Sequence, residues 1–80
     1  MTQMPELRTK MAVYRQLVAI GRSAVFPPQD WKGMRTPLNA PMFGAFVRFL
    51  ERVPGCKRSY EWTKGNTVKD FMRQVPLPTL

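Results

Sequence analysis

Few side chains in this sequence could carry out covalent or metal chemistry. Its 80 residues include no His and a single Cys, Cys56. Nucleophilic enzymes commonly pair Ser or Cys with a His base, and protein zinc sites need several His or Cys ligands. Neither Glu51 nor Glu61 has a partner arrangement typical of acid–base catalysis. We therefore expect no enzymatic activity, no metal site and no cofactor of the protein's own.

The charged side chains are mostly basic and favour an acidic partner. Thirteen Lys and Arg against five Asp and Glu give a formal net charge of +8. Nucleic acid, an anionic membrane surface and an acidic protein all suit such a charge. The hydrophobic content of 44% indicates a folded state. Because so short a chain buries a poor core and one Cys forms no internal disulfide, we expect assembly into something larger.

One candidate binding surface lies in the N-terminal part of the chain. Arg8, Arg15 and Arg22 recur every seven residues, which is nearly two helical turns. In a helix they would form a row along one side. Arginine suits carboxylates and phosphates because its planar guanidinium binds them with two parallel hydrogen bonds. This pattern predicts a surface for an acidic partner.

A second candidate surface is the basic, aromatic link 54–66. In this link, basic residues are interleaved with a Tyr and a Trp. These residues are Lys57, Arg58, Tyr60, Trp62 and Lys64. Such a mixture could bind RNA through phosphate contacts and base stacking. The other interpretation is a solvated link whose two aromatics pack on the second helix or on a neighbouring protein. Cys56 is followed by Lys57 and Arg58 and could be reactive, although an inert, partly buried thiol is more usual.

Three helices are predicted to position these residues, at about 5–25, 41–53 and 67–75. Pro5 suits the first helix turn, and Asn39 is a plausible cap of the second helix. Thr67 and Asp70 have the spacing of a capping box at the start of the third. We therefore predict an all-α protein, folded as one small domain over 1–80.

The first helix is expected to bury a broad apolar face. Met11, Tyr14 and Val18 fall on its centre, and further apolar residues widen it. These flanking residues are Val13, Leu17, Ile20 and Ala24. Gly21 lies in line with the stripe and could permit the close approach of another backbone.

Proline-rich segments join the predicted helices. We expect the connector 27–41 to lie across a partner's surface, with Trp31 and Met34 as anchors, because a loop this long is unusual inside a small domain. Residues 76–80 are expected to form an extended tail. No apolar run approaches the roughly 20 residues of a membrane-spanning helix, so we expect a protein peripheral to any membrane.

The tripeptide Val13-Tyr14-Arg15, followed by Gln16-Leu17, resembles the motif of the LYR family of small mitochondrial proteins. Members of that family carry Leu-Tyr-Arg early in a first helix. Here Val13 stands in place of Leu, and the resemblance covers the first quarter of the chain. It implies a LYR-like three-helix arrangement and a place in the mitochondrial matrix or on the matrix face of the inner membrane. The basic N-terminal segment is compatible with a matrix signal and with an ordinary basic helix.

The LYR resemblance also implies a function. Members are accessory subunits of respiratory-chain or ATP synthase complexes, or assembly factors for mitochondrial complexes. Many bind the mitochondrial acyl carrier protein, whose acyl-phosphopantetheine chain inserts among the helices. Val13, Tyr14 and Arg15 are the matching positions here, with Arg8 and Arg22 toward the partner's acidic surface. An alternative, favoured by the net charge, is a mitochondrial ribosomal protein that contacts rRNA.

Overall fold

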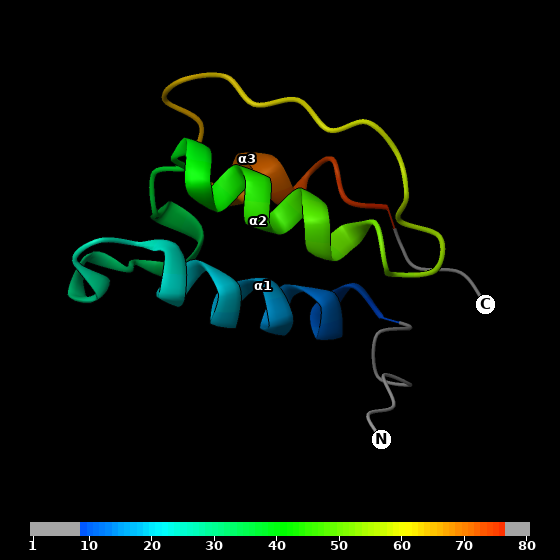
Figure 1. Ribbon diagram of the computed structural model, residues 1–80, viewed down its shortest axis with the longest axis horizontal. Coiled ribbons are helices and arrows are strands. Elements are labelled where there is room, and N and C mark those ends of the chain that lie inside the picture. The colour runs from blue at the N-terminus through cyan, green and yellow to red at the C-terminus, as the bar shows by residue number, and fades with distance from the viewer. Residues whose placement is uncertain (1–8, 77–80) are drawn as a thin grey trace.

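The computed structural model describes residues 9–76, and the helices of this part form an all-α arrangement (Figure 1). The α-helices are α1 at Lys10–Ala24, α2 at Ala40–Leu50 and α3 at Val68–Met72. Two short 3-10 helices, η2 at Pro28–Asp30 and η3 at Gly33–Arg35, lie between α1 and α2. Within the described residues no strand forms, which confirms the predicted all-α class. None of the helices in this part has both the length and the apolar composition to cross a membrane.

The start of α1 is fixed by a side-chain cap. The Thr9 hydroxyl accepts a hydrogen bond from the Ala12 N–H at 3.0 Å, which satisfies one of the amides left free in the first turn. The helix ends before Val25, whose backbone is extended. The predicted start near Pro5 lies outside the described residues.

The other two helices start where predicted but end earlier. Asn39 caps α2 by accepting the Met42 N–H at 2.8 Å, and Thr67 and Asp70 form the capping box of α3. The α2 helix ends at Leu50 instead of 53, because the chain turns toward Gly55, which has a φ of 85°. The α3 helix ends at Met72 instead of 75, and a turn then leads to Pro76.

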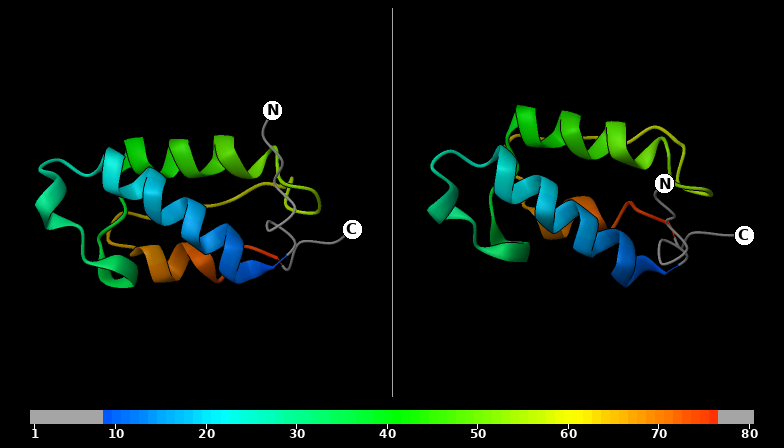
Figure 2. Two further views of the ribbon diagram at one scale, coloured as in Figure 1. Left: turned by 90° about the horizontal axis from the view of Figure 1, so that it is seen from below. Right: turned by 60° about the horizontal axis from the view of Figure 1, so that its bottom comes forward.

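The three helices enclose one core, and α1 packs directly on α2 (Figures 1 and 2). From the end of α2, the link 54–66 runs back along the molecule to the start of α3. Two backbone hydrogen bonds tie the starts of α2 and α3 together. Leu38 donates to the Asn66 carbonyl at 2.8 Å, and Val68 donates to the Thr36 carbonyl at 2.9 Å.

Apolar side chains from all three helices fill the core. Its largest fully buried members are Phe46, Phe71, Leu17, Met42, Leu50, Val13, Val68, Val75 and Cys56. Every buried side-chain nitrogen or oxygen within the described residues has a hydrogen-bond partner. The core is therefore closed by the chain itself.

The buried face of α1 differs from the predicted one. Val13, Leu17 and Gly21 are buried, whereas Met11 is 60% exposed. Since successive residues of an α-helix are about 100° apart, the core-facing side is rotated by roughly a quarter turn from the stripe through Met11, Tyr14 and Val18. That predicted stripe lies beside the core and leaves an apolar strip at the surface.

The connector 27–41 also departs from expectation, because it folds against its own chain. The η2 segment packs on α1, and η3 packs on α3. The indole of Trp31 covers Gly21, where an added Cβ would come only 2.7 Å from the ring atom Cη2. Thr36 is buried, and its hydroxyl accepts the Lys32 N–H at 2.6 Å. Trp31 thus packs on α1 of its own chain.

Candidate docking site

The only cysteine is shielded from solution chemistry. Cys56 is a free, buried thiol whose Sγ lies 3.9 Å from the Pro76 carbonyl oxygen. Burial raises the pKa of this thiol, and the positive charge of Lys10 only partly opposes that shift. Because the thiolate is the reactive form, this environment favours the inert interpretation. Over residues 9–76 there is also no group of three or more His, Cys, Asp or Glu that could hold a metal ion.

The structure separates the three residues that match the LYR motif. Val13 is fully buried in the core, Tyr14 is half-buried, and Arg15 is exposed. The α-helical rotation of about 100° per residue sends consecutive side chains in different directions. Tyr14 and Arg15 are therefore available to a partner, whereas the Val13 side chain is enclosed by this chain's own core.

The arginines predicted as a row on the first helix are placed in part. Arg15 and Arg22 are both exposed on the outer side of α1, while Arg8 lies outside the described residues. In the described part of the chain the only ion pair joins Arg73 to Asp70, at 3.8 Å. The outer side of α1 therefore presents positive charge to solvent.

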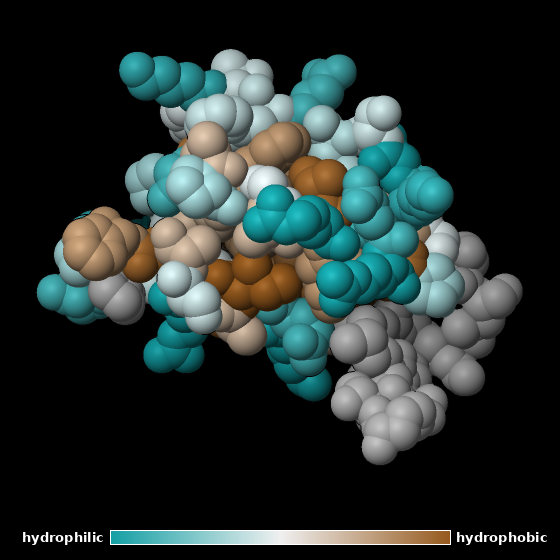
Figure 3. Space-filling model, viewed as in Figure 1, coloured by the Kyte–Doolittle hydropathy of each residue, from teal (hydrophilic) through white to brown (hydrophobic). Residues whose placement is uncertain are grey.

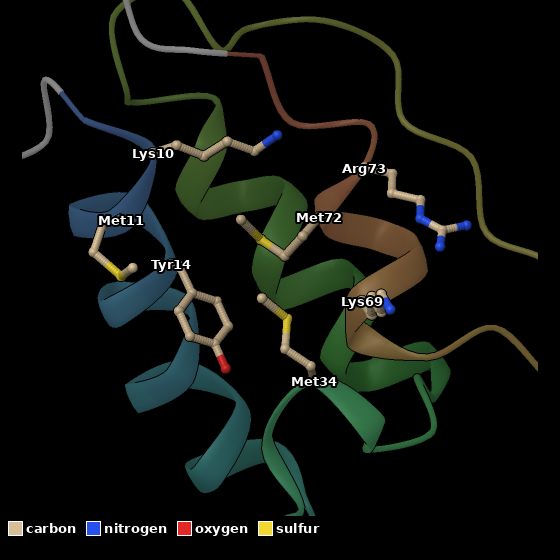
Figure 4. Close-up of a pocket in the computed structure, with 7 residues that line it drawn as sticks. All are labelled: Lys10, Met11, Tyr14, Met34, Lys69, Met72 and Arg73. Atoms are coloured by element: carbon tan, nitrogen blue, oxygen red, sulfur yellow. The ribbon is translucent and has the colours of Figure 1, made fainter.

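A groove opens between α1, η3 and α3 (Figure 4). Its volume is about 410 Å³, and its lining residues are Lys10, Met11, Tyr14, Met34, Lys69, Met72 and Arg73. The methionines and Tyr14 form apolar walls, and the lysines and the arginine add positive charge around them. We refer to these seven residues as the methionine groove.

The methionine groove exists because of how the helices pair. The α1 helix packs on α2, and the five-residue α3 packs on η3, so α3 does not cover the strip of α1 that carries Met11 and Tyr14. Met11 is 60% exposed and Met34 is 36% exposed, so both side chains leave apolar surface open along the groove. Sequence reasoning did not predict this groove, because its walls come from three separate elements. The one indication in the sequence was the apolar stripe of the first helix, which includes Met11 and Tyr14 and is wider than a single packed helix could cover.

The aromatic residues of the link 54–66 point to the core. The Trp62 indole N–H donates to the Leu38 carbonyl at 3.0 Å, and its ring stacks on Phe43 with centroids 6.0 Å apart. The Tyr60 ring lies 5.4 Å from Phe71, and its hydroxyl donates to the Cys56 carbonyl. Burial is the main cause that raises the pKa of Tyr60. These contacts match the interpretation that the two aromatics pack on the helices.

The basic residues of the link divide into two groups. Arg58 is held by the chain, since its Nη1 donates to the Gln74 carbonyl at 3.2 Å and its guanidinium lies 5.8 Å from the Tyr60 ring centroid. Lys57 and Lys64 are exposed. The link is also fastened by the Gln74 side chain, which accepts the Glu61 N–H at 2.8 Å and donates to the Glu61 carbonyl at 2.6 Å. A partner would therefore meet two free lysines and the tethered but exposed Arg58 here, together with aromatic rings that are only partly accessible.

A smaller pocket of about 240 Å³ lies between α1 and α2. It is lined by Ile20, Ala45, Arg48, Phe49 and Arg52. In the space-filling view, apolar surface gathers over α1 and α2, with hydrophilic side chains around it (Figure 3). Basic charge beside apolar surface is thus found on more than one side of α1.

Comparison with protein-family models, curated proteins and solved structures finds no match for this chain. The resemblance to the LYR family thus rests on the residues around Tyr14 and Arg15. The geometry adds that these two side chains are accessible and that exposed basic residues surround them.

Proposed function

We propose that this protein is a non-catalytic accessory subunit of a large mitochondrial inner-membrane complex, of the respiratory or ATP synthase type. The observation that carries the proposal is the outer face of α1. There Arg15 and Arg22 are exposed, and Met11, one helical turn before Arg15, is an apolar side chain that is 60% exposed. Such a face combines charge for an acidic protein with apolar area for affinity. The mitochondrial assignment is supported by the LYR resemblance.

The same face is the proposed docking site for mitochondrial acyl carrier protein. Arg15 would meet acidic side chains of the carrier, with Tyr14 beside it, because guanidinium forks bind carboxylates in pairs of hydrogen bonds. The buried side of α1 is already filled by residues such as Leu17, which packs in the core with Phe46. An acyl chain entering between α1 and α2 would have to displace them. We therefore propose docking through the surface, with any acyl chain outside this core.

Isolation of the native complex tests this proposal. The tagged full-length chain should co-migrate on native gels with subunits of one inner-membrane complex. The double variant Arg15→Glu, Arg22→Glu should lose that association. Lys57→Glu with Lys64→Glu is the matched control, because it changes the net charge equally on the link 54–66. The control variant should stay in the complex.

The remaining candidate functions give different results in the same experiment. Ribosomal RNA in the particle, together with loss of association in the lysine variant only, would replace the proposal by the ribosomal alternative. Association with assembly intermediates but not with the mature complex would indicate an assembly factor. If acyl carrier protein stays bound to the Arg15→Glu, Arg22→Glu variant, the proposed contact at Arg15 is wrong.

A further inference from the structure

We propose that the methionine groove is a second docking site and that its occupant is an acidic amphipathic helix of a partner protein. The groove borders the Arg15 and Arg22 face, with which it shares Met11 and Tyr14, and its other walls come from η3 and α3. This inference rests on the proposed function in one respect, namely that the protein acts by docking.

The walls of the groove suit the apolar side of a helix. Three methionines from different elements line the groove, namely Met11 of α1, Met34 of η3 and Met72 of α3. In Figure 4, Met34 and Met72 extend toward α1, and the Tyr14 ring points toward them. Methionine is unbranched and polarisable, so it adapts to apolar side chains of different shapes. Grooves that receive amphipathic helices use this property, and the helix supplies anchors at i, i+3, i+4 and i+7. The volume of about 410 Å³ leaves room for more than one such anchor.

The charges at the groove select an acidic occupant. Lys10 stands at the start of α1, Lys69 lies on α3, and Arg73 is the residue that caps the C-terminal end of α3. None of the residues that line the groove is acidic. Arg73 reaches Asp70 at 3.8 Å, but both side chains are substantially exposed, and such pairs contribute little. The Asp70 carboxylate is held at the cap by the Thr67 N–H at 2.8 Å. The three cations are thus available to carboxylates that flank an inserted apolar face.

The lining argues against other occupants. A small polar ligand needs several convergent hydrogen-bonding groups inside its pocket. Tyr14 supplies the one neutral polar side chain among the lining residues. Single-stranded nucleic acid is held by aromatic rings on which successive bases stack, whereas this groove offers one ring, that of Tyr14, among three methionines. A helix with an apolar face and acidic flanking residues matches both the apolar walls and the basic side chains of the groove.

Methionine methyl NMR on the full-length chain tests the proposal. The probe is a synthetic peptide with Leu at i, i+3, i+4 and i+7 and Glu at the flanking positions. We expect saturable shifts of the Met11, Met34 and Met72 methyl signals as the peptide is added. Added salt should weaken the binding, because the contact is partly ionic. A peptide with Lys in place of Glu is the charge control, and dodecanoate is the small-amphiphile control. Both should bind much more weakly than the acidic peptide.

Variants locate the peptide. Lys69→Glu with Arg73→Glu should weaken binding about tenfold or more, because truncating or reversing interface charges costs affinity. Lys57→Glu with Lys64→Glu has the same change in net charge away from the groove and should bind as the original chain does. Met11→Gln alters an exposed side chain, so it tests the apolar wall without disturbing the core. Circular dichroism establishes that each variant is folded.

The proposal is overturned if the acidic peptide leaves the methionine signals unchanged, or if the Lys peptide binds equally well. Preferential binding of dodecanoate would make the groove a site for small amphiphiles instead. Equal affinity in the Lys69, Arg73 variant would also contradict it. If that variant loses the peptide but stays in the native complex, the groove is not the contact with that complex. The function proposed from Arg15 and Arg22 would still stand.

Discussion

Gly21 shows how an absent side chain decides the packing of a distant residue. It lies in the middle of α1, where glycine costs the helix about 1 kcal/mol relative to alanine. The structure explains its presence, because the Trp31 ring occupies the space where a Cβ would project. Sequence analysis predicted a close approach at Gly21. It named a backbone as the neighbour, and the neighbour is a side chain.

The effect of Gly21→Ala on the free energy of unfolding should therefore depend on the residue at position 31, and it should be of opposite sign with Trp and with Ala there. In the original chain, the new Cβ displaces the indole, and we expect a loss of about 1–3 kcal/mol in the free energy of unfolding. In a Trp31→Ala background the space is free, so the same substitution should stabilise the chain by up to about 1 kcal/mol. Urea denaturation of the four proteins measures the coupling. Equal effects in both backgrounds would show that Trp31 does not rest on Gly21.

The α3 helix illustrates an element that its sequence signals locate but do not stabilise. A helix of five residues is too short to persist on its own. The Thr67–Asp70 capping box fixes its start, and burial of Phe71 and Met72 holds it against the core. Hydrogen bonds that Thr67 donates to the Asp70 carboxylate lower the pKa of Asp70. The bond from the Thr67 backbone N–H is the largest cause, and the bond from the Thr67 hydroxyl is the second.

Asp70 should make stability depend on pH at the acid side. Its pKa is lower in the folded chain than its ordinary value of 3.8, so its contribution is present above that pH and is lost as the pH falls through the folded value. Asp70→Asn should remove this part of the acid destabilisation. Thr67→Ala should cost about 1 kcal/mol at neutral pH through loss of the cap. Urea denaturation at neutral pH and below 3.8 measures both. An Asn variant with the same acid profile as the original chain would refute the assignment.

The α1 helix shows why periodicity placed an element but not its buried side. Apolar residues occupy so much of α1 that several rotations of the helix would bury a continuous stripe. The buried side of α1 is set by its neighbours. The α2 helix packs against α1, and the Trp31 ring packs closely on Gly21, which must therefore face the interior. Met11 and Tyr14 are consequently left on the groove side. Their role could not be read from α1 without the positions of η3 and α3.

Residues 9–76 enclose a hydrophobic core of their own, although the chain is short. The sequence predicted dependence on a larger assembly. In the structure, apolar residues of all three helices and the link are buried together, and buried polar side chains in the described part are satisfied. We therefore expect a cooperative, although modest, stability for the isolated chain. The interaction surfaces then lie outside the core, on α1 and in the methionine groove.

A pair of α1 variants tests this account of the molecule. Leu17→Ala removes a fully buried side chain and should lower the free energy of unfolding by about 2–5 kcal/mol. Met11→Ala truncates a side chain that is 60% exposed and should change it by only about 0.5 kcal/mol. Both values come from urea denaturation of the full-length chain. A broad transition in the original chain, or equal losses in the two variants, would contradict a closed core centred on Leu17.

The helical class, the caps at Asn39 and Thr67 and the excess of basic charge can all be predicted from the amino-acid sequence. These follow from local backbone chemistry and composition, which do not depend on distant residues. The packing of the helices, in contrast, is what encloses Val13 and leaves Met11 largely exposed. It also turned Tyr60 and Trp62 toward the helices and brought Lys10, Lys69 and Arg73 around one groove. Those outcomes depend on which surfaces bury the most apolar area together, and that is settled only when all elements pack at once.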